Sequence, residues 1–324
     1  MTSSYWRKRR VLVTGHEGLL GSWLTKALIK QGSNLIGLDK VKARQFSVLA
    51  GFRDKIKIAK GNVSSLTLVK KVIKRYKPQT IFHLAAQAIV GEANKDPIET
   101  FKSNIQGTWN LLEAARGNDF IESIVVASSD KAYGVQESLP YQEDSSLRGS
   151  HPYDVSKSCA DLLSYTYYNT YGLPVCMTRC GNIFGPGDHH FSRIVPDTVR
   201  KALAGETLLI RSDGKFTRDY IYVKDVVEGY LLLASKMKKL GLYGQAFNFS
   251  NEKPVSVLKL VSAIYKLCGQ ESNYKIVNQA KAEIRDQYLS SQKAKKILGW
   301  RAKYNLERGL QKTIKWYTKV YSFV

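Results

Sequence analysis

Short apolar runs alternate with amphipathic segments along the first half of the chain. The apolar runs are typical of buried parallel strands and lie at residues 11–15, 34–39, 80–85, 123–128 and 174–179. Between them, apolar residues recur at helical spacing over residues 20–31, 65–76, 97–116 and 152–171. Because these segments are long enough for right-handed crossovers between parallel strands, the pattern predicts an α/β fold with a Rossmann-type doubly wound parallel sheet.

The pattern becomes irregular after residue 179. Helical spacing is found over residues 192–204, 224–236, 255–268 and 306–321, and short strand patterns over 207–210, 219–223 and 246–250. We expect residues 224–250 to return to the main sheet. The chain is therefore predicted to form a larger Rossmann domain, residues 1–180 with about 216–250, and a smaller C-terminal α/β domain, about 181–215 with 251–324.

Three glycines stand at three-residue spacing where the first strand meets the first helix. Gly15 permits a tight turn, Gly18 lets the backbone approach a pyrophosphate, and Gly21 lets the helix pack closely on the sheet. Asp39 ends the second strand, where a carboxylate can bind a ribose hydroxyl or cap a turn. Its charge would repel a 2′-phosphate, which favours NAD over NADP, although three basic residues follow closely.

Two further groups of residues carry acid–base chemistry. Tyr153 and Lys157 are four residues apart on one predicted helix, so both side chains lie on one helical face. An ammonium group beside a phenol favours the phenolate, so we expect Lys157 to lower the pKa of Tyr153 towards neutrality. Ser129, Asp130 and Lys131 follow the strand at residues 123–128, at the edge where open α/β sheets bind ligands.

Together these motifs resemble the extended short-chain dehydrogenase/reductase family, and within it the nucleotide-sugar 4,6-dehydratases and epimerases. The similarity includes the glycine loop, the Tyr153–Lys157 pair and the segments at residues 83–87, 104–108, 178–186 and 218–225. The Asp130-Lys131 pair and residues 14–16 look like those of the CDP-glucose 4,6-dehydratases. Residues 218–220 resemble the wider family instead.

The resemblance implies a dinucleotide site and a nucleotide-sugar site. It implies that NAD is bound by Gly15, Gly18, Leu19, Leu20, Gly21, Asp39, Asn62, Val63, Leu84, Ala85, Ala86, Gln87, Asn104, Tyr153 and Lys157. It implies that a nucleotide-diphosphate sugar is bound by Gln87, Ser129, Asn182, Arg193, Arg218 and Arg285. Asn62 stands where the family usually has an Asp that contacts adenine.

The implied reaction begins when Tyr153, aided by Lys157, takes the proton of the sugar 4-hydroxyl while hydride passes from C4 to NAD⁺. Asp130 is the candidate acid for the departing 6-hydroxyl, and Ser129 would hydrogen-bond the 4-oxygen. Lys131 is a candidate base for the C5 proton only if burial or nearby cations favour its neutral form. Return of the hydride to C6 gives a 4-keto-6-deoxy sugar.

Two other functions stay open. A nucleotide-sugar 4-epimerase would also use Tyr153 and Lys157, but it eliminates no water and does not need Asp130 and Lys131. In that case Asp130 and Lys131 would form an ordinary ion pair at a strand end. A protein that binds a dinucleotide without turnover, or binds nucleic acid through its charge, is the alternative from another class.

The net charge is +23, from 50 Lys and Arg against 27 Asp and Glu. The basic residues form short scattered groups without the spacing of a nucleic-acid motif, so we expect a solvated basic surface and no nucleic-acid partner. The four cysteines form no CxxC pair and are expected to be reduced core residues. His189 and His190 form a pair in a loop, but the sequence offers no third ligand for a metal ion, so we expect no metal.

Location and assembly follow from the remaining features. The basic first ten residues precede an apolar run too short for a signal peptide, and no stretch reaches the roughly 18 apolar residues of a membrane span. We therefore expect a cytoplasmic protein. The resemblance implies a homodimer that pairs the helices at residues 97–116 and 152–171. Their exposed faces are expected to carry Phe101, Leu111, Leu112, Leu163, Tyr167 and Tyr168.

Overall fold

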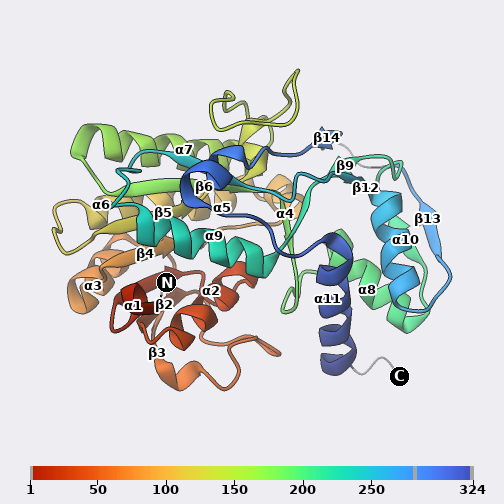
Figure 1. Ribbon diagram of the computed structural model, residues 1–324, viewed down its shortest axis with the longest axis horizontal. Helices are drawn as coiled ribbons and strands as arrows, with labels where there is room; N and C mark the ends of the chain where they lie inside the picture. The colour runs from red at the N-terminus through yellow and green to blue at the C-terminus, as the bar shows by residue number, and fades with distance from the viewer. Residues whose placement is uncertain (1–2, 280–282, 322–324) are drawn as a thin grey trace.

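The computed structural model describes residues 3–279 and 283–321 of the chain. A seven-stranded parallel sheet in the order β11-β6-β5-β4-β1-β2-β3 forms its centre (Figure 1). Its strands are β1 (Arg10–Thr14), β2 (Asn34–Asp39), β3 (Ile56–Lys60), β4 (Thr80–His83), β5 (Ser123–Ala127), β6 (Val175–Cys180) and β11 (Ala246–Phe249). The predicted Rossmann-type fold is confirmed.

The register of the sheet explains why the apolar runs could be recognised. Val13 of β1 lies between Gly37 of β2 and Phe82 of β4, and all five residues of β1 except the first are buried. Strands covered on both faces need apolar residues at every position. β3 was not predicted, because this edge strand has a single neighbour and alternates lysine with apolar residues.

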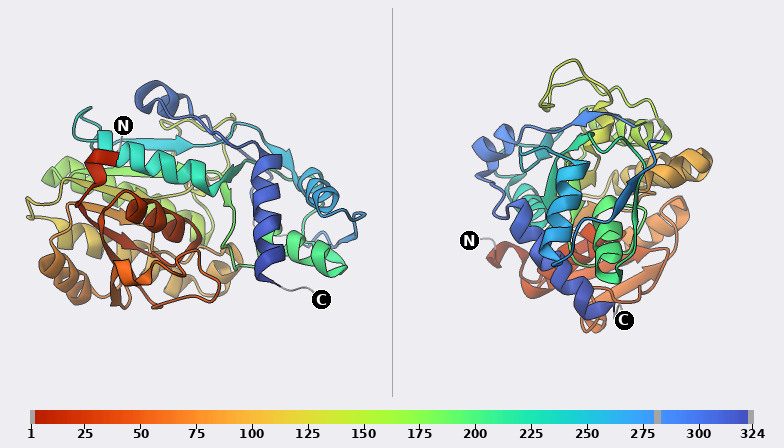
Figure 2. Two further views of the ribbon diagram at one scale, coloured as in Figure 1. Left: turned by 60° about the horizontal axis from the view of Figure 1, so that its bottom comes forward. Right: turned by 90° about the vertical axis from the view of Figure 1, so that its right-hand side faces the viewer.

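Helices cover both faces of the sheet (Figure 2). On one face lie α2 (Leu19–Lys30) and α9 (Val223–Lys236), whose apolar residues share a core with the short α1 (Ser3–Trp6). On the other face lie α3 (Leu66–Tyr76), α6 (Gly107–Ala115) and α7 (Pro152–Tyr171). The predicted bounds of α7 agree with the structure at both ends.

The single helix expected at residues 97–116 has a change of geometry in its middle. It consists of α5 (Pro97–Phe101), the π-helical segment η2 (Lys102–Gln106) and α6. Apolar spacing does not reveal a π-turn, because that turn changes the hydrogen-bonding step and not the composition. The short α4 (Val90–Lys95), which lies just before α5, also had no sequence signal of its own.

A smaller group of elements lies beside the main sheet (Figure 1). Its strand pairs are β7 (Asn182–Phe184) with β10 (Tyr220–Tyr222), β8 (Leu208–Ile210) with β13 (Tyr274–Ile276), and β9 (Thr217–Arg218) with both β12 (Val255–Ser256) and β14 (Asp286–Gln287). Its helices are α8 (Ile194–Ala204), α10 (Val257–Leu267) and α11 (Leu306–Val320). The remaining short helical segments are η1 (Arg53–Lys55), η3 (Asp130–Tyr133) and η4 (Ala294–Leu298).

The strand expected at residues 219–223 differs in the structure. Only Tyr220–Tyr222 of it are strand (β10), α9 already begins at Val223, and β9, which precedes Asp219, belongs to a different sheet. The division of the chain into two domains with the stated bounds stays a prediction.

Over residues 3–279 and 283–321, no helix is both long and apolar enough to cross a membrane.

Candidate active site

A cavity of about 910 Å³ lies at the carboxyl edge of the main sheet and extends to the smaller group of elements. It is lined by all five expected catalytic residues and by all expected binding residues except Asn104 and Arg285. Parallel strands end at the same edge, which brings together segments far apart in the sequence.

The glycine loop lies at one end of this cavity. Gly15 has a φ of +71°, and a Cβ there would lie 2.9 Å from the Ala85 backbone. At Gly21 a Cβ would lie 2.0 Å from the carbonyl oxygen of Gly15, so only glycine lets α2 pack this closely. Gly18 is the N-cap of α2 and has no side chain to cover the first-turn amides. These features fit the pyrophosphate of NAD.

Asp39 ends β2 and lines the cavity next to the glycine loop. Its Oδ2 accepts a hydrogen bond from Glu17 N at 3.1 Å, and its Oδ1 accepts one from Val41 N at 3.3 Å. A carboxylate has about four acceptor positions, so Asp39 keeps capacity for ribose hydroxyls. Asn62 also lines the cavity, but its Oδ1 accepts from Ser64 N at 3.1 Å in a local turn.

A buried hydrogen-bond chain fixes the loop after β4. Thr14 Oγ1 accepts from the amides of Leu84 and Ala85 at 3.1 and 3.2 Å and lies 2.8 Å from His83 Nδ1. Burial lowers the pKa of His83 to about 3, so the imidazole is neutral. Since Thr14 already accepts twice, its hydroxyl donates to Nδ1, and the ring proton lies on Nε2, 3.2 Å from Thr108 Oγ1.

Asn104 supports the cavity without lining it. From the π-helical η2, its Oδ1 accepts from Gln87 N at 2.7 Å, and its Nδ2 donates to Gln87 O at 3.0 Å and to Ser156 Oγ at 2.9 Å. Asn104 therefore fixes the Gln87 backbone and connects it to Ser156 of α7.

Tyr153 and Lys157 lie side by side on α7, as their spacing predicts, but the expected pKa of Tyr153 is wrong for this structure. Burial raises the pKa of Tyr153 to about 12, and the Ser129 hydroxyl opposes this effect. Lys157 Nζ donates to Ala127 O at 2.7 Å and lies 5.9 Å from the Tyr153 ring centroid. Burial also lowers the pKa of Lys157 to about 8. The ammonium is thus bound to a carbonyl and not to the phenol.

The second pair of chemical groups lies on η3. Ser129 caps this segment, and its Oγ donates to Asp130 Oδ1 at 3.0 Å. Lys131 Nζ lies 3.4 Å from Asp130 Oδ1 and 3.2 Å from Asn182 Oδ1. The Asp130 side chain is 4% exposed, so this is not a solvated surface pair. Both groups line the same cavity as Tyr153.

The expected phosphate-binding residues occupy the far part of the cavity, with one exception. Arg193 Nη1 donates to Asp188 Oδ2 at 3.0 Å, and Arg218 Nη2 lies 3.8 Å from Glu283 Oε2. Both arginines line the cavity. The Arg285 side chain is 65% exposed and does not line it, although the Arg285 carbonyl accepts from Arg218 Nη1 at 2.8 Å.

The sequence-based interpretation missed some lining residues. Asp154 is buried, lines the cavity directly after Tyr153 and binds His151 Nδ1 at 3.0 Å. Only its adjacency to Tyr153 could have pointed to it. Cys180 and Tyr220 also line the cavity, from strands whose apolar character suggested core positions. Within the described residues, no three His, Cys, Asp or Glu side chains are placed to hold a metal ion.

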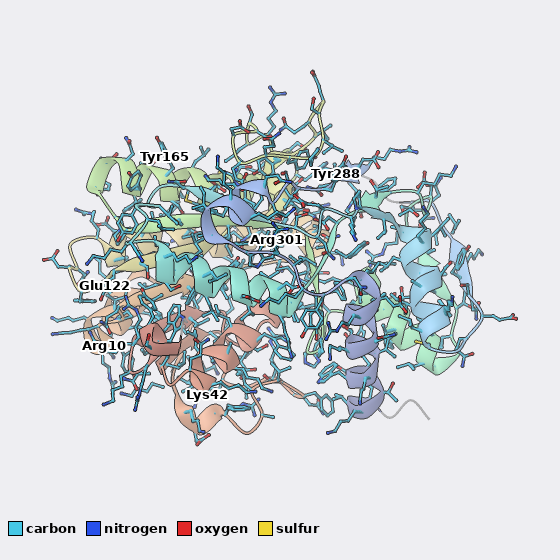
Figure 3. The ribbon with its side chains drawn as sticks, in the orientation of Figure 1. Arg10, Lys42, Glu122, Tyr165, Tyr288 and Arg301 are labelled. Atoms are coloured by element: carbon cyan, nitrogen blue, oxygen red, sulfur yellow. The ribbon has the colours of Figure 1, made fainter. Side chains whose placement is uncertain are left out.

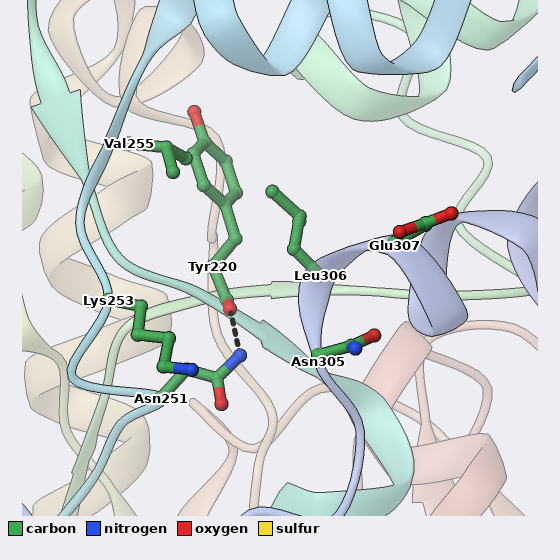
Figure 4. Close-up of a pocket in the computed structure, with 7 residues that line it drawn as sticks. All are labelled: Tyr220, Asn251, Lys253, Val255, Asn305, Leu306 and Glu307. Atoms are coloured by element: carbon green, nitrogen blue, oxygen red, sulfur yellow. Dashed lines mark hydrogen bonds between the residues drawn. The ribbon is translucent and has the colours of Figure 1, made fainter. Parts of the chain in front are cut away.

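Tyr220 also borders a second cavity of about 230 Å³ at the start of α11 (Figure 4). Asn251 Nδ2 donates to Tyr220 O at 3.3 Å on its wall. Apart from Tyr220, it shares no lining residue with the large cavity, and no expected site residue faces it.

Comparison with known proteins gives the same class as the geometry. Residues 11–248 match the NAD dependent epimerase/dehydratase family. The chain is 28% identical over 330 residues to the CDP-glucose 4,6-dehydratase of Salmonella typhimurium, across 97% of this chain and 92% of that enzyme. It is 30% identical over 312 residues to the UDP-glucose 4-epimerase of Mycolicibacterium smegmatis, across 95% and 98%.

A solved structure extends the comparison to the fold. The dTDP-glucose 4,6-dehydratase of Streptomyces venezuelae, solved with NAD bound, superposes with a TM-score of 0.89 at 27% identity, covering 96% of this chain and 97% of that one. The chain belongs to the NAD dependent epimerase/dehydratase family. The predicted family and the NAD-dependent enzyme class are confirmed.

Proposed function

We propose that this protein is a nucleotide-sugar 4,6-dehydratase that converts CDP-glucose to the 4-keto-6-deoxy sugar. The observation that carries the proposal is the presence of two acid–base pairs in one cavity, Tyr153 with Lys157 and Asp130 with Lys131. The similarity to a CDP-glucose dehydratase over almost the whole chain supports the choice of nucleotide.

The two ligands are assigned to the two ends of the cavity. The Rossmann residues 1–180 with about 216–250 would hold NAD through the glycine loop, Asp39 and the loop after β4. Residues of about 181–215 and 251–324 would hold the nucleotide sugar. Arg193 and Arg218 there offer guanidinium groups, whose planar donors suit phosphate oxygens. Arg285, which lies outside the cavity, would reach substrate only after a side-chain movement.

Each catalytic residue of the cavity has its own role in the proposed reaction. Tyr153 takes the proton of the 4-hydroxyl, and Ser129 holds the 4-oxygen while the ketone forms. NAD, held by the glycine loop and Asp39, would supply reversible hydride transfer at the sugar ring. Lys131 can take the C5 proton, which the ketone has made acidic, only as a neutral amine, which it becomes by passing its own proton to Asp130 at 3.4 Å; Asp130 then gives that proton to the departing 6-hydroxyl. The hydrogen bond from Lys131 Nζ to Asn182 fixes the amine at this position.

A 4-epimerase on the same scaffold is the second candidate, because relatives with that activity also match the whole chain. An epimerase eliminates no water and gives Asp130 and Lys131 no task. Asp130 is buried and Lys131 is 19% exposed in the cavity beside Tyr153, which favours the dehydratase, since an ion pair largely removed from water adds little net stability by itself. Binding of nucleic acid without turnover is the alternative outside enzymes.

The test is incubation with CDP-, dTDP-, UDP- and GDP-glucose, with the alkali-induced absorbance of a 4-keto product as the readout. Tyr153→Phe should lower turnover by about 10²–10⁴-fold, because it removes the general base and keeps the ring. Asp130→Asn should still oxidise C4 and should accumulate reduced cofactor. Accumulation of a C4 epimer without loss of water would refute the dehydratase.

A homodimer through α5, α6 and α7 also belongs to this proposal, with a corrected set of surface residues. Leu111 and Leu112 are fully buried in a core cluster that includes residues of the main sheet, so they cannot face a partner. Phe101, Leu163, Tyr167 and Tyr168 are only partly exposed. The large apolar side chains that these helices expose are Ile98, Trp109, Leu162, Tyr165 and Tyr171, of which Tyr165 is labelled on α7 in Figure 3. A cytoplasmic location and the absence of a nucleic-acid partner stay predictions.

A further inference from the structure

A buried ion pair joins β6 to α7 behind the cavity. Arg179 Nε and Nη2 donate to the two carboxylate oxygens of Asp161, both at 2.8 Å. The two side chains are 6% and 3% exposed. Asp161 lies one helical turn after Lys157, on the face of α7 that carries the proposed oxidation residues.

The same guanidinium reaches a third element. Arg179 Nη1 donates to the hydroxyl of Tyr133 at 2.7 Å, and its Cζ lies 4.7 Å from the Tyr133 ring centroid. Tyr133 is the last residue of η3, and its hydroxyl donates in turn to Asn248 Oδ1 on β11 at 2.8 Å. Arg179 Nη1 also donates to Glu143 O at 2.9 Å. One buried side chain thus connects β6, α7, η3 and the loop after η3.

A contribution to stability does not by itself explain these buried contacts of Arg179. A buried ion pair adds little net stability compared with apolar packing, but it fixes geometry closely. The planar guanidinium has five donors in a rigid plane, and four contacts here set the directions of α7 and η3 relative to β6. Burial lowers the pKa of Lys157, and the Asp161 carboxylate opposes this effect. Asp161 therefore also favours the charged form of Lys157.

We propose that Arg179 is a positioning residue that keeps Asp130 and Lys131 of η3 in register with Tyr153 and Lys157 of α7. The inference rests on the proposed dehydratase function, in which both pairs act in turn on one sugar ring. Oxidation needs the α7 pair and Ser129, which caps the start of η3, but not the side chains of Asp130 and Lys131. Elimination also needs the η3 pair within reach of C5 and O6, and a misplacement of about 1 Å can cost about 10²-fold in rate.

The sharpest variant is Tyr133→Phe, because it removes one hydroxyl, with its hydrogen bonds to Arg179 and Asn248, and leaves Arg179 paired with Asp161. Removing Arg179 itself would leave a buried carboxylate without its partner and could prevent folding. With CDP-glucose, Tyr133→Phe should lower kcat for the 4-keto-6-deoxy product by at least about tenfold, with KM within about twofold. Reduced cofactor should accumulate in single turnover, because oxidation proceeds and elimination lags.

Tyr141→Phe is the matched control. Tyr141 is equally buried, its ring centroid lies 5.0 Å from that of Tyr133, and its hydroxyl donates to Gly134 O at 2.7 Å. It makes no contact with the guanidinium among the hydrogen bonds of the described residues. Its loss should lower thermal stability about as much as Tyr133→Phe, with no accumulation of reduced cofactor. Equal accumulation in both variants would overturn the proposal, because it would indicate general loosening.

Amide hydrogen exchange gives a readout that does not depend on turnover. Tyr133→Phe should speed exchange over residues 130–134 and leave residues 153–161 unchanged, whereas Tyr141→Phe should leave residues 130–133 near wild type. Unchanged exchange at η3 in Tyr133→Phe would refute the positioning role. If the wild type acts on no nucleotide sugar, the proposed function fails, and hydrogen exchange still decides whether Arg179 holds η3 in place.

Discussion

Lys157 is a buried cation whose burial is unfavourable for folding. Burial lowers its pKa from 10.5 to about 8, and 1.36 kcal/mol per pKa unit makes the full penalty about 3 kcal/mol. Below pH 8 the folded protein must hold the charge in the interior, so the whole penalty is present. Between pH 8 and 10.5 the unfolded lysine binds a proton that the folded one has lost, so stability rises with pH.

Lys157→Met should therefore stabilise the nucleotide-free protein while abolishing catalysis, because an apolar side chain of similar length replaces the charge. The gain in the free energy of unfolding should be up to about 3 kcal/mol at pH 7 and should approach zero near pH 10.5. Denaturant unfolding at several pH values measures it. Tyr153→Phe is the control and should show no such dependence between pH 7 and about 9, where the tyrosine is protonated both in the unfolded protein (pKa about 10) and in the folded one (pKa about 12). A destabilised Lys157→Met at pH 7 would contradict this account.

Residue identity and spacing were enough to predict most of the side chains that meet in the cavity, although Arg285 lies outside it and Asp154 was missed, but not their charge states. The pKa of Tyr153 depends on how deeply α7 is buried and on which acceptor Lys157 selects, and neither is encoded locally. The Arg179 contacts were equally hidden. Asp161 and Tyr133 lie 18 and 46 residues from Arg179, and no motif relates these positions.

At the scale of elements, the buried strands of the main sheet were predicted well, as were β8, β10 and β11, whereas β3 and the two-residue strands were not. β1, β2, β4, β5 and β6 were found because their environment demands continuous apolar residues. β3 has one neighbour, and β9, β12 and β14 contribute only two residues each, so their composition carries little information. The small strands that shape the substrate end of the cavity are thus products of tertiary packing.

The start of α11 gives a prediction at this scale. Asn305 is its N-cap, and Asn305 Oδ1 accepts from Arg308 N at 2.8 Å. Asn305→Ala should lower the free energy of unfolding by about 1 kcal/mol, because the amide of Arg308 loses its partner. Asn305→Ser restores an acceptor and should recover most of the loss. Chemical denaturation of the three proteins compares them, and equal stability of Asn305→Ala and wild type would show that the cap contributes nothing.

For the whole molecule, the exposed apolar side chains of α5, α6 and α7 predict the assembly state. Ile98, Trp109, Leu162 and Tyr165 are 66%, 42%, 56% and 51% exposed. A second copy would cover such a surface, since monomers rarely leave apolar side chains together in water. Wild-type protein should sediment as a dimer at micromolar concentration.

Leu162→Glu should shift the protein to monomer by placing a charge in the interface. Leu240→Glu is the matched control, because Leu240 is 44% exposed but lies outside these helices, after α9. It should leave the sedimentation coefficient unchanged. A monomeric wild type, or equal dissociation by both variants, would contradict the proposed interface.

The place of β11 in the sheet has a consequence for how the protein is made. β11 comes from residues 246–249 but pairs with β6, which ends at residue 180, so a growing chain finishes the sheet only after the whole intervening stretch has left the ribosome. During that interval β6 presents an apolar open edge, the kind of edge that pairs with other chains. Newly made protein should therefore be most dependent on chaperones, and most prone to aggregate, between the synthesis of residues 180 and 249.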